Sequence, residues 1–263
     1  MTDIKRTLTE NLARVRERIA AACASARRAP ESVKLIAVTK YAGLDVLKVM
    51  PDVGLTDLGE SRAPELVKRA AAINEFLSRR ARDLSAGAMP RPHWHMIGHL
   101  QRNKVKLVLP WTEMVHSVDS LRLAEEVNTR AGSLDRVVDV LLQVNCSGEE
   151  SKFGVAVGAV THLAEMIAPL PHISLCGLMT MAPYTEDETV IRSTFTRCQE
   201  LFDEIRHDLD VGPQFRHLSM GMSHDFEIAI ACGATIVRIG TALFEGLPTV
   251  REETADADAV SAD

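Results

Sequence analysis

The chain has 263 residues, of which 46% are hydrophobic and 25% are charged, and its formal net charge is -6. This is the composition of a globular protein that is long enough to bury a large core. The acidic balance argues against a basic surface for nucleic acid or an anionic membrane, so the charge disfavours both roles. The sequence also contains no run of about 18 apolar residues, which a helix needs to span a bilayer.

The N-terminal segment predicts an amphipathic helix. Ile4, Leu8, Leu12, Val15 and Ile19 recur at spacings of three and four residues, with arginine and glutamate between them. This start is charged throughout and lacks the apolar stretch of a secretory signal, so we expect a cytoplasmic protein. The five cysteines form no CxxC pair, which favours reduced thiols.

After this helix, short β-branched runs alternate with helical patterns. Eight runs predict strands, at residues 33–39, 54–59, 93–98, 114–118, 137–145, 173–181, 216–220 and 235–239. Helical patterns cover residues 45–50, 61–82, 101–109, 120–131, 155–168, 187–209 and 226–232. Residues 86–92 are rich in glycine and proline, which predicts a loop.

Eight such βα units in about 210 residues predict one α/β domain, a single closed (β/α)8 TIM barrel with an extra N-terminal helix. We expect it to span residues 1–250. An open doubly wound sheet is the alternative, but no GxGxxG sequence follows the first strand. Residues 251–263 are acidic and nearly without large apolar side chains, so we expect a disordered tail.

The functional groups of such a barrel stand at the C-terminal ends of its strands. Lys40 ends the first strand, where burial or a neighbouring cation would make its amine a nucleophile; a lysine that reaches the solvent at the rim is the alternative. Arg238, Gly240 and Thr241 end the last strand. Gly240 would let backbone N–H groups approach an anion and Thr241 adds a hydroxyl, although a plain glycine turn is the alternative.

The end of the seventh strand adds two hydroxyls, from Ser219 and Ser223, a glycine at position 221 and two flexible methionines, Met220 and Met222. Methionine side chains can line a planar ring, and core packing is the alternative for them. In a closed barrel this segment neighbours the end of the last strand. The two segments together predict a phosphate-binding cup.

The third strand carries two histidines on one face, His93 and His95, as a metal site could. No carboxylate or cysteine is placed to complete a ligand set, so we predict no metal and assign His95 to a pocket wall. Ser61, after the second strand, and Met179, in the sixth, lie at the same rim of the barrel.

Several of these segments form a familiar set in chain order. They are AVTK (37–40), GESR (59–62), WHMIGHLQRNK (94–104), GLMT (177–180), LSMGMS (218–223) and VRIGT (237–241). The set extends over about residues 5–246 and resembles the pyridoxal phosphate homeostasis protein family, also called the proline synthase co-transcribed homologues.

The resemblance implies a type III fold for pyridoxal 5′-phosphate (PLP), that is, an alanine-racemase-like barrel without a C-terminal β-domain. It implies PLP as the cofactor, bound as a Schiff base on Lys40, with phosphate contacts from the Ser219 segment, Gly240 and Thr241, and an Arg238 contact to the pyridine nitrogen. Ser61 replaces the asparagine usual in the family and reaches less far. The rest of the expected cofactor-binding set is His95, Met179, Met220 and Ser223.

The implied function is intracellular PLP homeostasis by a carrier without known catalytic turnover. The chemistry of Arg238 agrees, because a guanidinium only donates hydrogen bonds and would keep the pyridine nitrogen unprotonated, which weakens PLP as an electron sink. We expect PLP and PLP-dependent apo-enzymes as partners, no nucleic acid and no membrane. Without the β-domain that forms the racemase dimer, we expect a monomer.

Two other functions stay open at this point. A slow amino-acid racemase would need a second acid or base opposite Lys40, and the chain has two tyrosines, Tyr41 and Tyr184. Along a strand, Tyr41 would point away from its neighbour Lys40. The other alternative is a PLP-free aldolase in which Lys40 forms a Schiff base with a phosphorylated sugar.

Overall fold

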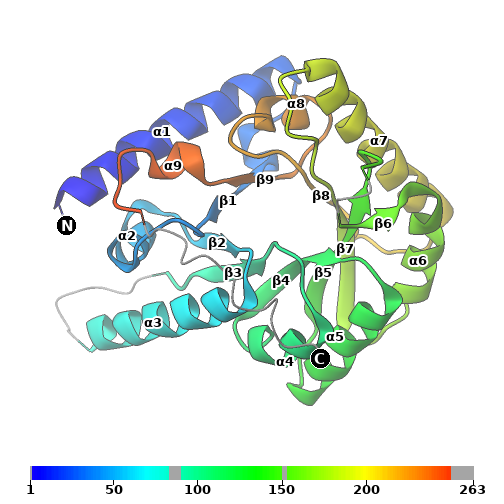
Figure 1. The fold of residues 1–263 in the computed structure, drawn as a ribbon, viewed down its shortest axis with the longest axis horizontal. Coiled ribbons are helices and arrows are strands. Elements are labelled where there is room, and N and C mark those ends of the chain that lie inside the picture. Colours follow the sequence, from blue (N-terminus) through cyan, green and yellow to red (C-terminus); the bar gives the residue numbers. More distant parts are fainter. Residues whose placement is uncertain (1, 83–89, 150–152, 250–263) are drawn as a thin grey trace, which may run out of the picture.

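Eight parallel strands form a closed ring in the computed structural model, which describes residues 2–82, 90–149 and 153–249 (Figure 1). The ring runs in the order β4-β3-β2-β1-β9-β8-β7-β5, and a pairing of β4 with β5 closes it. The predicted barrel is confirmed and the open sheet is excluded. The strands are β1 (Lys34–Val38), β2 (Asp57–Glu60), β3 (His93–Met96), β4 (Thr112–Val118), β5 (Val138–Asn145), β7 (Ile173–Met179), β8 (His217–Ser219) and β9 (Ile236–Ile239).

Helices connect the strands and cover the outside of the ring (Figure 1). Among the described residues, no helix has both the length and the apolar character needed to cross a membrane. The helices are α1 (Thr2–Ser25), α2 (Leu44–Val49), α3 (Ala63–Ala81), α4 (Val105–Val108), α5 (Leu121–Ser133), α6 (Val160–Ile167), α7 (Glu188–Asp208), α8 (Phe226–Ala231) and α9 (Thr241–Phe244).

The N-terminal helix α1 lies outside the βα repeat and packs on α8 and α9 (Figure 1). Its predicted apolar stripe is confirmed, since Leu8, Leu12, Val15 and Ile19 are buried. The side-chain amide of Asn11 donates hydrogen bonds of 2.9 Å to two carbonyl oxygens at the end of α9, those of residues 243 and 245. Helix α1 therefore fixes the segment that follows the last strand.

Most predicted boundaries are within one or two residues of the observed ones, and three are wrong by more. Residues 54–56 do not join β2, because a 3-10 helix at Met50–Val53 ends at Gly54 in the left-handed region, with φ 78°. The helix predicted over 101–109 divides into a 3-10 turn at Arg102–Lys104 and α4. Helix α9 was not predicted. The acidic tail and most of the loop predicted at 86–92 lie outside the described residues.

The helix predicted over 155–168 begins only at Val160, because Val155–Ala156 form a short extra strand, β6, beside β5. Gly154 permits this contact. Its φ is 129°, and a Cβ there would lie 2.7 Å from the backbone nitrogen of Asn145. The helical periodicity of the segment conceals this close approach of the chain to β5.

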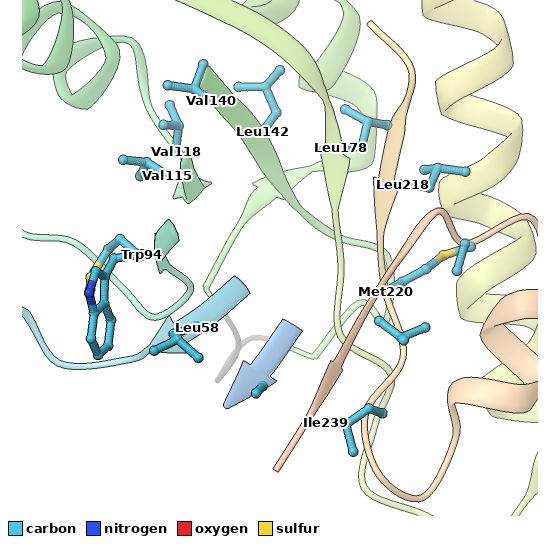
Figure 2. Packing of buried hydrophobic residues seen from close by; sticks show 14 of the residues in the cluster. Leu58, Trp94, Val115, Val118, Val140, Leu142, Leu178, Leu218, Met220 and Ile239 are labelled. Carbon is cyan, nitrogen blue, oxygen red and sulfur yellow. The ribbon is translucent and has the colours of Figure 1, made fainter. Parts of the chain in front are cut away.

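The alternation of side chains along the strands divides the core into two parts. Outward-facing residues pack between the strands and the helices, and Figure 2 shows this layer, which includes Leu58, Trp94, Leu178, Leu218, Met220 and Ile239. Inside the ring lies a smaller apolar cluster of Ile36, Met114, Leu141, Cys176, Met179 and Ile236. The barrel is thus filled by side chains, as is usual for eight strands.

We predict that Gly177→Ala destabilises the barrel by about 2 kcal/mol or more. Gly177 has a φ of 147°, and a Cβ would lie 1.8 Å from the carbonyl oxygen of His217, so β7 and β8 would have to separate. Urea unfolding followed by circular dichroism measures the effect. Gly158→Ala is the control, because no atom lies within 4 Å of its Cβ position. Equal stability of the two variants would contradict this account.

Candidate functional site

A network of buried polar groups holds the turn that carries Lys40. The hydroxyl of Thr39 donates to the backbone oxygen of Gly59 and to the carboxylate of Glu60, both at 3.2 Å. Lys40 itself is half-buried, and its Nζ stands 4.4 Å from the centre of the Tyr41 ring. The backbone is therefore fixed by β1 and β2, while the amine remains accessible at the C-terminal rim.

Arg69, from α3, binds the same turn from the outside. Its guanidinium donates to the carbonyl oxygens of Thr39 at 2.7 Å, Ala42 at 2.8 Å and Lys40 at 3.2 Å. Its Nε lies 3.3 Å from the fully buried carboxylate of Glu60. Removing one partner of such a pair would leave an uncompensated buried charge, so the two residues stabilise the turn only together.

Ser61 lies at the same rim, one residue after Glu60. Its backbone N–H donates to Glu60 Oε1 at 2.8 Å, and the other carboxylate oxygen accepts from Thr39. Gly98 packs so closely that a Cβ there would lie 2.2 Å from the carbonyl oxygen of Ser61. The carboxylate of Glu60 therefore links Ser61 to Thr39, the residue that precedes Lys40.

The ends of β8 and β9 form a group of hydrogen-bond donors. The hydroxyl oxygen of Ser223 accepts from the backbone N–H groups of Gly240 at 3.3 Å and Ala242 at 3.4 Å. Thr241 is exposed between them. A Cβ on Gly240 would lie 3.4 Å from Val38, so the end of β9 passes tightly over the end of β1.

These donors line a cavity of about 660 Å³ whose wall also includes Tyr41, Tyr184 and His224. Backbone N–H groups and hydroxyls that converge on one hollow are the groups that bind phosphate oxygens. Ser223, Gly240 and Thr241 are thus brought together as the sequence predicted. Tyr41 belongs to this wall, at the rim, but the expectation that it points away from Lys40 is wrong: its ring lies beside the Lys40 amine, because β1 ends at Val38.

Arg238 points from β9 into the barrel. Its Nη1 donates to the Ser219 hydroxyl at 2.6 Å and its Nη2 to the Thr180 carbonyl oxygen at 3.0 Å. Burial lowers the pKa of the guanidinium to about 10, and the nearby carboxylate of Asp225 limits the fall. Arg238 therefore remains a cation at neutral pH, with N–H groups beyond the two that these acceptors use.

The structure places the side chains of His95 and Met220 away from the rim, while Ser219 stands at the C-terminal end of β8. The hydroxyl of Ser219 is engaged by Arg238, and His95 lies deep in the barrel, bonded to Asp57 at 3.2 Å. Met220 packs in the apolar layer outside the strands (Figure 2), whereas its neighbour Ser219 bonds to Arg238 inside the barrel. Direct cofactor contacts from the side chains of Met220 and His95 do not fit these positions. Met179, by contrast, lies inside the barrel.

The two histidines of β3 lie in different environments. His93 is exposed, with its Nδ1 4.0 Å from Glu113, whereas His95 is buried. Within the described ranges there is no group of three or more histidine, cysteine, aspartate or glutamate side chains that could hold a metal ion.

Sequence reasoning missed the pairing of Glu60 with Arg69, and it missed Asp57 and His116, which both bond to His95. The spacing of Glu65 and Arg69 is four residues, which indicates an ordinary helix-surface pair and hides the inward turn of the arginine. His116 sits in an apolar strand and was not considered. A histidine in such a strand is a signal of an internal hydrogen-bond partner.

Comparisons with known proteins give a consistent result. A family model described as the N-terminal domain of alanine racemase matches residues 10–248. The pyridoxal phosphate homeostasis protein of Aquifex aeolicus is 41% identical over 235 residues, which is 89% of this chain and 96% of the relative. The protein of the same name from Escherichia coli is 35% identical over 238 residues, covering 90% of this chain and 95% of its own length.

Solved structures agree with these relatives. An unknown protein from Bifidobacterium adolescentis superposes with a TM-score of 0.83 at 39% identity, over 93% of this chain and 97% of its own. PipY of Synechococcus elongatus, with PLP bound, superposes with a TM-score of 0.71 at 32% identity, over 86% of this chain and 99% of its own. Alanine racemase of Corynebacterium glutamicum superposes with a TM-score of 0.64 at 14% identity, over 95% of this chain and 64% of its own. At this identity the likeness is one of fold alone.

The buried histidines should make stability depend on pH. Burial, followed by the charge of Arg216, lowers the pKa of His217 to about 4, and burial also lowers the pKa values of His95 and His116. In the unfolded chain these rings titrate near pH 6.5. The unfolded state therefore binds more protons than the folded state below about pH 6.5, and the free energy of unfolding falls as the pH is lowered towards 4.

Urea unfolding between about pH 7 and pH 5 tests this expectation. The variant His116→Leu removes one of the histidines that take up a proton on unfolding. The decrease should be shallower in that variant. His162→Gln is the control, because His162 is an exposed residue of α6. A profile that is flat over this range in the unmodified protein would contradict the prediction.

Proposed function

The chain belongs to the pyridoxal phosphate homeostasis protein family, and on this premise we propose that it holds PLP as a Schiff base on Lys40 and carries the cofactor in vitamin B6 homeostasis. One observation supports the assignment above the others. Because β1 pairs with β9, the amine of Lys40 and the donor group around Gly240 and Ser223 lie at the C-terminal ends of neighbouring strands. The relative PipY, with PLP bound in its structure, supports the same ligand.

In this proposal Lys40 supplies the amine. Condensation of its ε-amine with the aldehyde carbon of PLP forms one C=N bond and releases one water. The hydrogen bonds from Arg69 hold the backbone of residues 39, 40 and 42, so only the lysine side chain has to move to reach the aldehyde. Such prior ordering lowers the entropic cost of forming the linkage.

The hydroxyls of Ser223 and Thr241 and the backbone N–H groups of Gly240 and Ala242 would hold the phosphate. The two N–H groups converge on the Ser223 oxygen at the wall of the cavity, and the oxygens of a phosphate dianion would replace that oxygen as their acceptor. The missing side chain of Gly240 keeps the backbone accessible where it passes over Val38. We propose that Ser61 and Met179 face the pyridine ring.

Arg238 weighs against strong electron-sink chemistry such as decarboxylation, and the placement of the two tyrosines weighs against a racemase. When bound, PLP withdraws electrons from an attached amino acid most strongly if its ring nitrogen is protonated. A guanidinium that stays charged can only donate to that nitrogen, so it keeps the nitrogen unprotonated. A racemase would need a second acid or base on the far face of the cofactor ring. Of the two tyrosines, Tyr184 is 92% exposed, and Tyr41 lies beside the Lys40 amine, on the same side as the amine.

We also propose that the protein works in the cytoplasm as a monomer and passes PLP to PLP-dependent apo-enzymes. The described cysteines are all free thiols, which suits a reducing compartment. The exposed large apolar residues of the described chain come from separate segments of the sequence, among them Leu107, Phe153 and Tyr184. A half-buried lysine at an open rim suits transfer of the cofactor to another protein.

Borohydride reduction tests the covalent assignment. Protein incubated with PLP and then reduced should give one modified peptide, which carries the pyridoxyl group on Lys40. Lys40→Ala should lose both the modification and the violet absorption. Lys48→Ala, on α2, is the matched control and should retain both. Modification of a different lysine, with Lys40 unmodified, would refute the proposal.

The phosphate cup is tested by comparing PLP with pyridoxal, which lacks the phosphate. We expect the unmodified protein to bind PLP about 100-fold more tightly, since charge-assisted hydrogen bonds to phosphate would be lost. In the double variant Ser223→Ala with Thr241→Val, the preference should fall to about 10-fold or less. Ser193→Ala, on α7, is the control. An unchanged preference would place the phosphate elsewhere.

A further inference from the structure

A chain of hydrogen bonds crosses the interior of the barrel behind Arg238. From Arg238 it runs to Ser219 at 2.6 Å, from Ser219 to His116 Nδ1 at 2.9 Å, and from His116 Nε2 to His95 Nδ1 at 3.1 Å. It ends at Asp57, whose Oδ1 lies 3.2 Å from His95 Nε2. The five residues come from five strands, β9, β8, β4, β3 and β2.

The two ends of this chain fix the direction of every hydrogen bond. Arg238 can only donate, so the Ser219 oxygen accepts from it, and the Asp57 carboxylate can only accept, so His95 Nε2 carries a proton. A neutral His95 then accepts at Nδ1, which requires a proton on His116 Nε2. His116 therefore accepts at Nδ1 from the hydroxyl of Ser219.

The neutral state of both histidines fits their surroundings. Burial lowers the pKa of His116 far below its usual value, and a second proton on His95 or the charge of Arg238 would lower it further. Burial also lowers the pKa of His95, against the influence of Asp57. Burial raises the pKa of Asp57, but the hydrogen bond from His95 and the charge of Lys34 outweigh it and bring the value to about 2. An ionised Asp57 with neutral His95 and His116 is the set of protonation states that the hydrogen-bond directions require.

We propose that Asp57, His95 and His116 are positioning residues that act through Ser219 to hold the Arg238 guanidinium in the orientation in which it meets the ring nitrogen of the cofactor. We call Asp57, His95, His116 and Ser219 the polar relay. This inference rests on the proposed function, because it assigns Arg238 to the pyridine nitrogen. None of the relay residues needs to touch the cofactor.

The geometry explains how an aspartate at one end of the barrel affects an arginine at the other. The Ser219 hydroxyl can rotate, and only an acceptor at His116 Nδ1 keeps its hydrogen turned away from Arg238 and its oxygen free to accept. His116 presents that acceptor only in the tautomer that His95 and Asp57 select. At the far end, Lys34 lies 3.1 Å from Asp57 and balances its charge.

The tautomers can be measured without cofactor. Nitrogen-15 NMR of the full chain at neutral pH should find both His95 and His116 protonated at Nε2 and bare at Nδ1. A proton on Nδ1 of either ring would overturn the proposal, because the direction of the hydrogen bonds would then be broken. This measurement is independent of whether the chain binds PLP.

The effect on the cofactor is tested with His116→Leu, which fills the same space but offers no acceptor. We expect the dissociation constant for PLP to rise about 10-fold and the visible band of the bound cofactor to shift. His116→Asn, whose side-chain oxygen can replace Nδ1 as the acceptor for Ser219, should restore most of both. His93→Leu is the matched control, because His93 is an exposed residue of the same strand as His95 and lies outside the relay.

A double-mutant comparison separates positioning from simple support of the fold. In an Arg238→Met background, His116→Leu should change PLP affinity less than about twofold, because the relay no longer has its target. Equal effects of His116→Leu with and without Arg238 would overturn the proposal. Failure of the unmodified protein to bind PLP would instead overturn the proposed function.

If His116→Leu does not fold, a comparison of two substitutions at Asp57 tests the proposal instead. Asp57 is a partly accessible residue at the far end of the relay. Asp57→Asn retains an acceptor for His95 and should keep the visible band of the bound cofactor, whereas Asp57→Ala should shift it towards the band of the Arg238→Met variant. Identical bands in Asp57→Ala and the unmodified protein would contradict the proposal.

Discussion

Four consecutive residue pairs join β1 to β9, from Lys34 beside Ile236 to Ala37 beside Ile239. This pairing connects the first strand of the barrel with the last, and the geometry of the candidate site depends on it. It brings the half-buried Lys40 to the strand end that neighbours Gly240, where an added Cβ would come into contact with Val38. An open sheet would leave these groups at opposite edges, and neither alone would indicate a cofactor.

The polar groups beneath the rim would be costly to bury singly, and they are stabilised because they are paired. Arg69 and Glu60 compensate each other while they bind the turn around Lys40. Arg238 is bound by Ser219 and by a main-chain oxygen, and its cationic character determines what a PLP ring could do beside it. The same buried interactions thus support the fold and restrict the chemistry of the site.

The sequence was sufficient to predict the strands and the rim, because both leave local signals. Eight apolar runs and the residues that follow them located Lys40, Ser223, Gly240 and Thr241, and the structure brings the last three together. The interior was less accessible to prediction. Hydrogen bonds such as that from Ser219 to His116 join strands on different sides of the ring, and no local pattern reports them. The sequence assigned His95 to a pocket wall and left Met220 between a ring contact and core packing, and the Met220 side chain packs outside the strands.

A crystal structure of the full chain soaked with PLP tests the central claim most directly. We predict continuous electron density from Lys40 to the cofactor, with the phosphate bound by Ser223 and the backbone N–H groups of residues 240–242 and the ring nitrogen within hydrogen-bond distance of Arg238. A cofactor joined to another lysine, or a phosphate bound away from the ends of β8 and β9, would contradict the account.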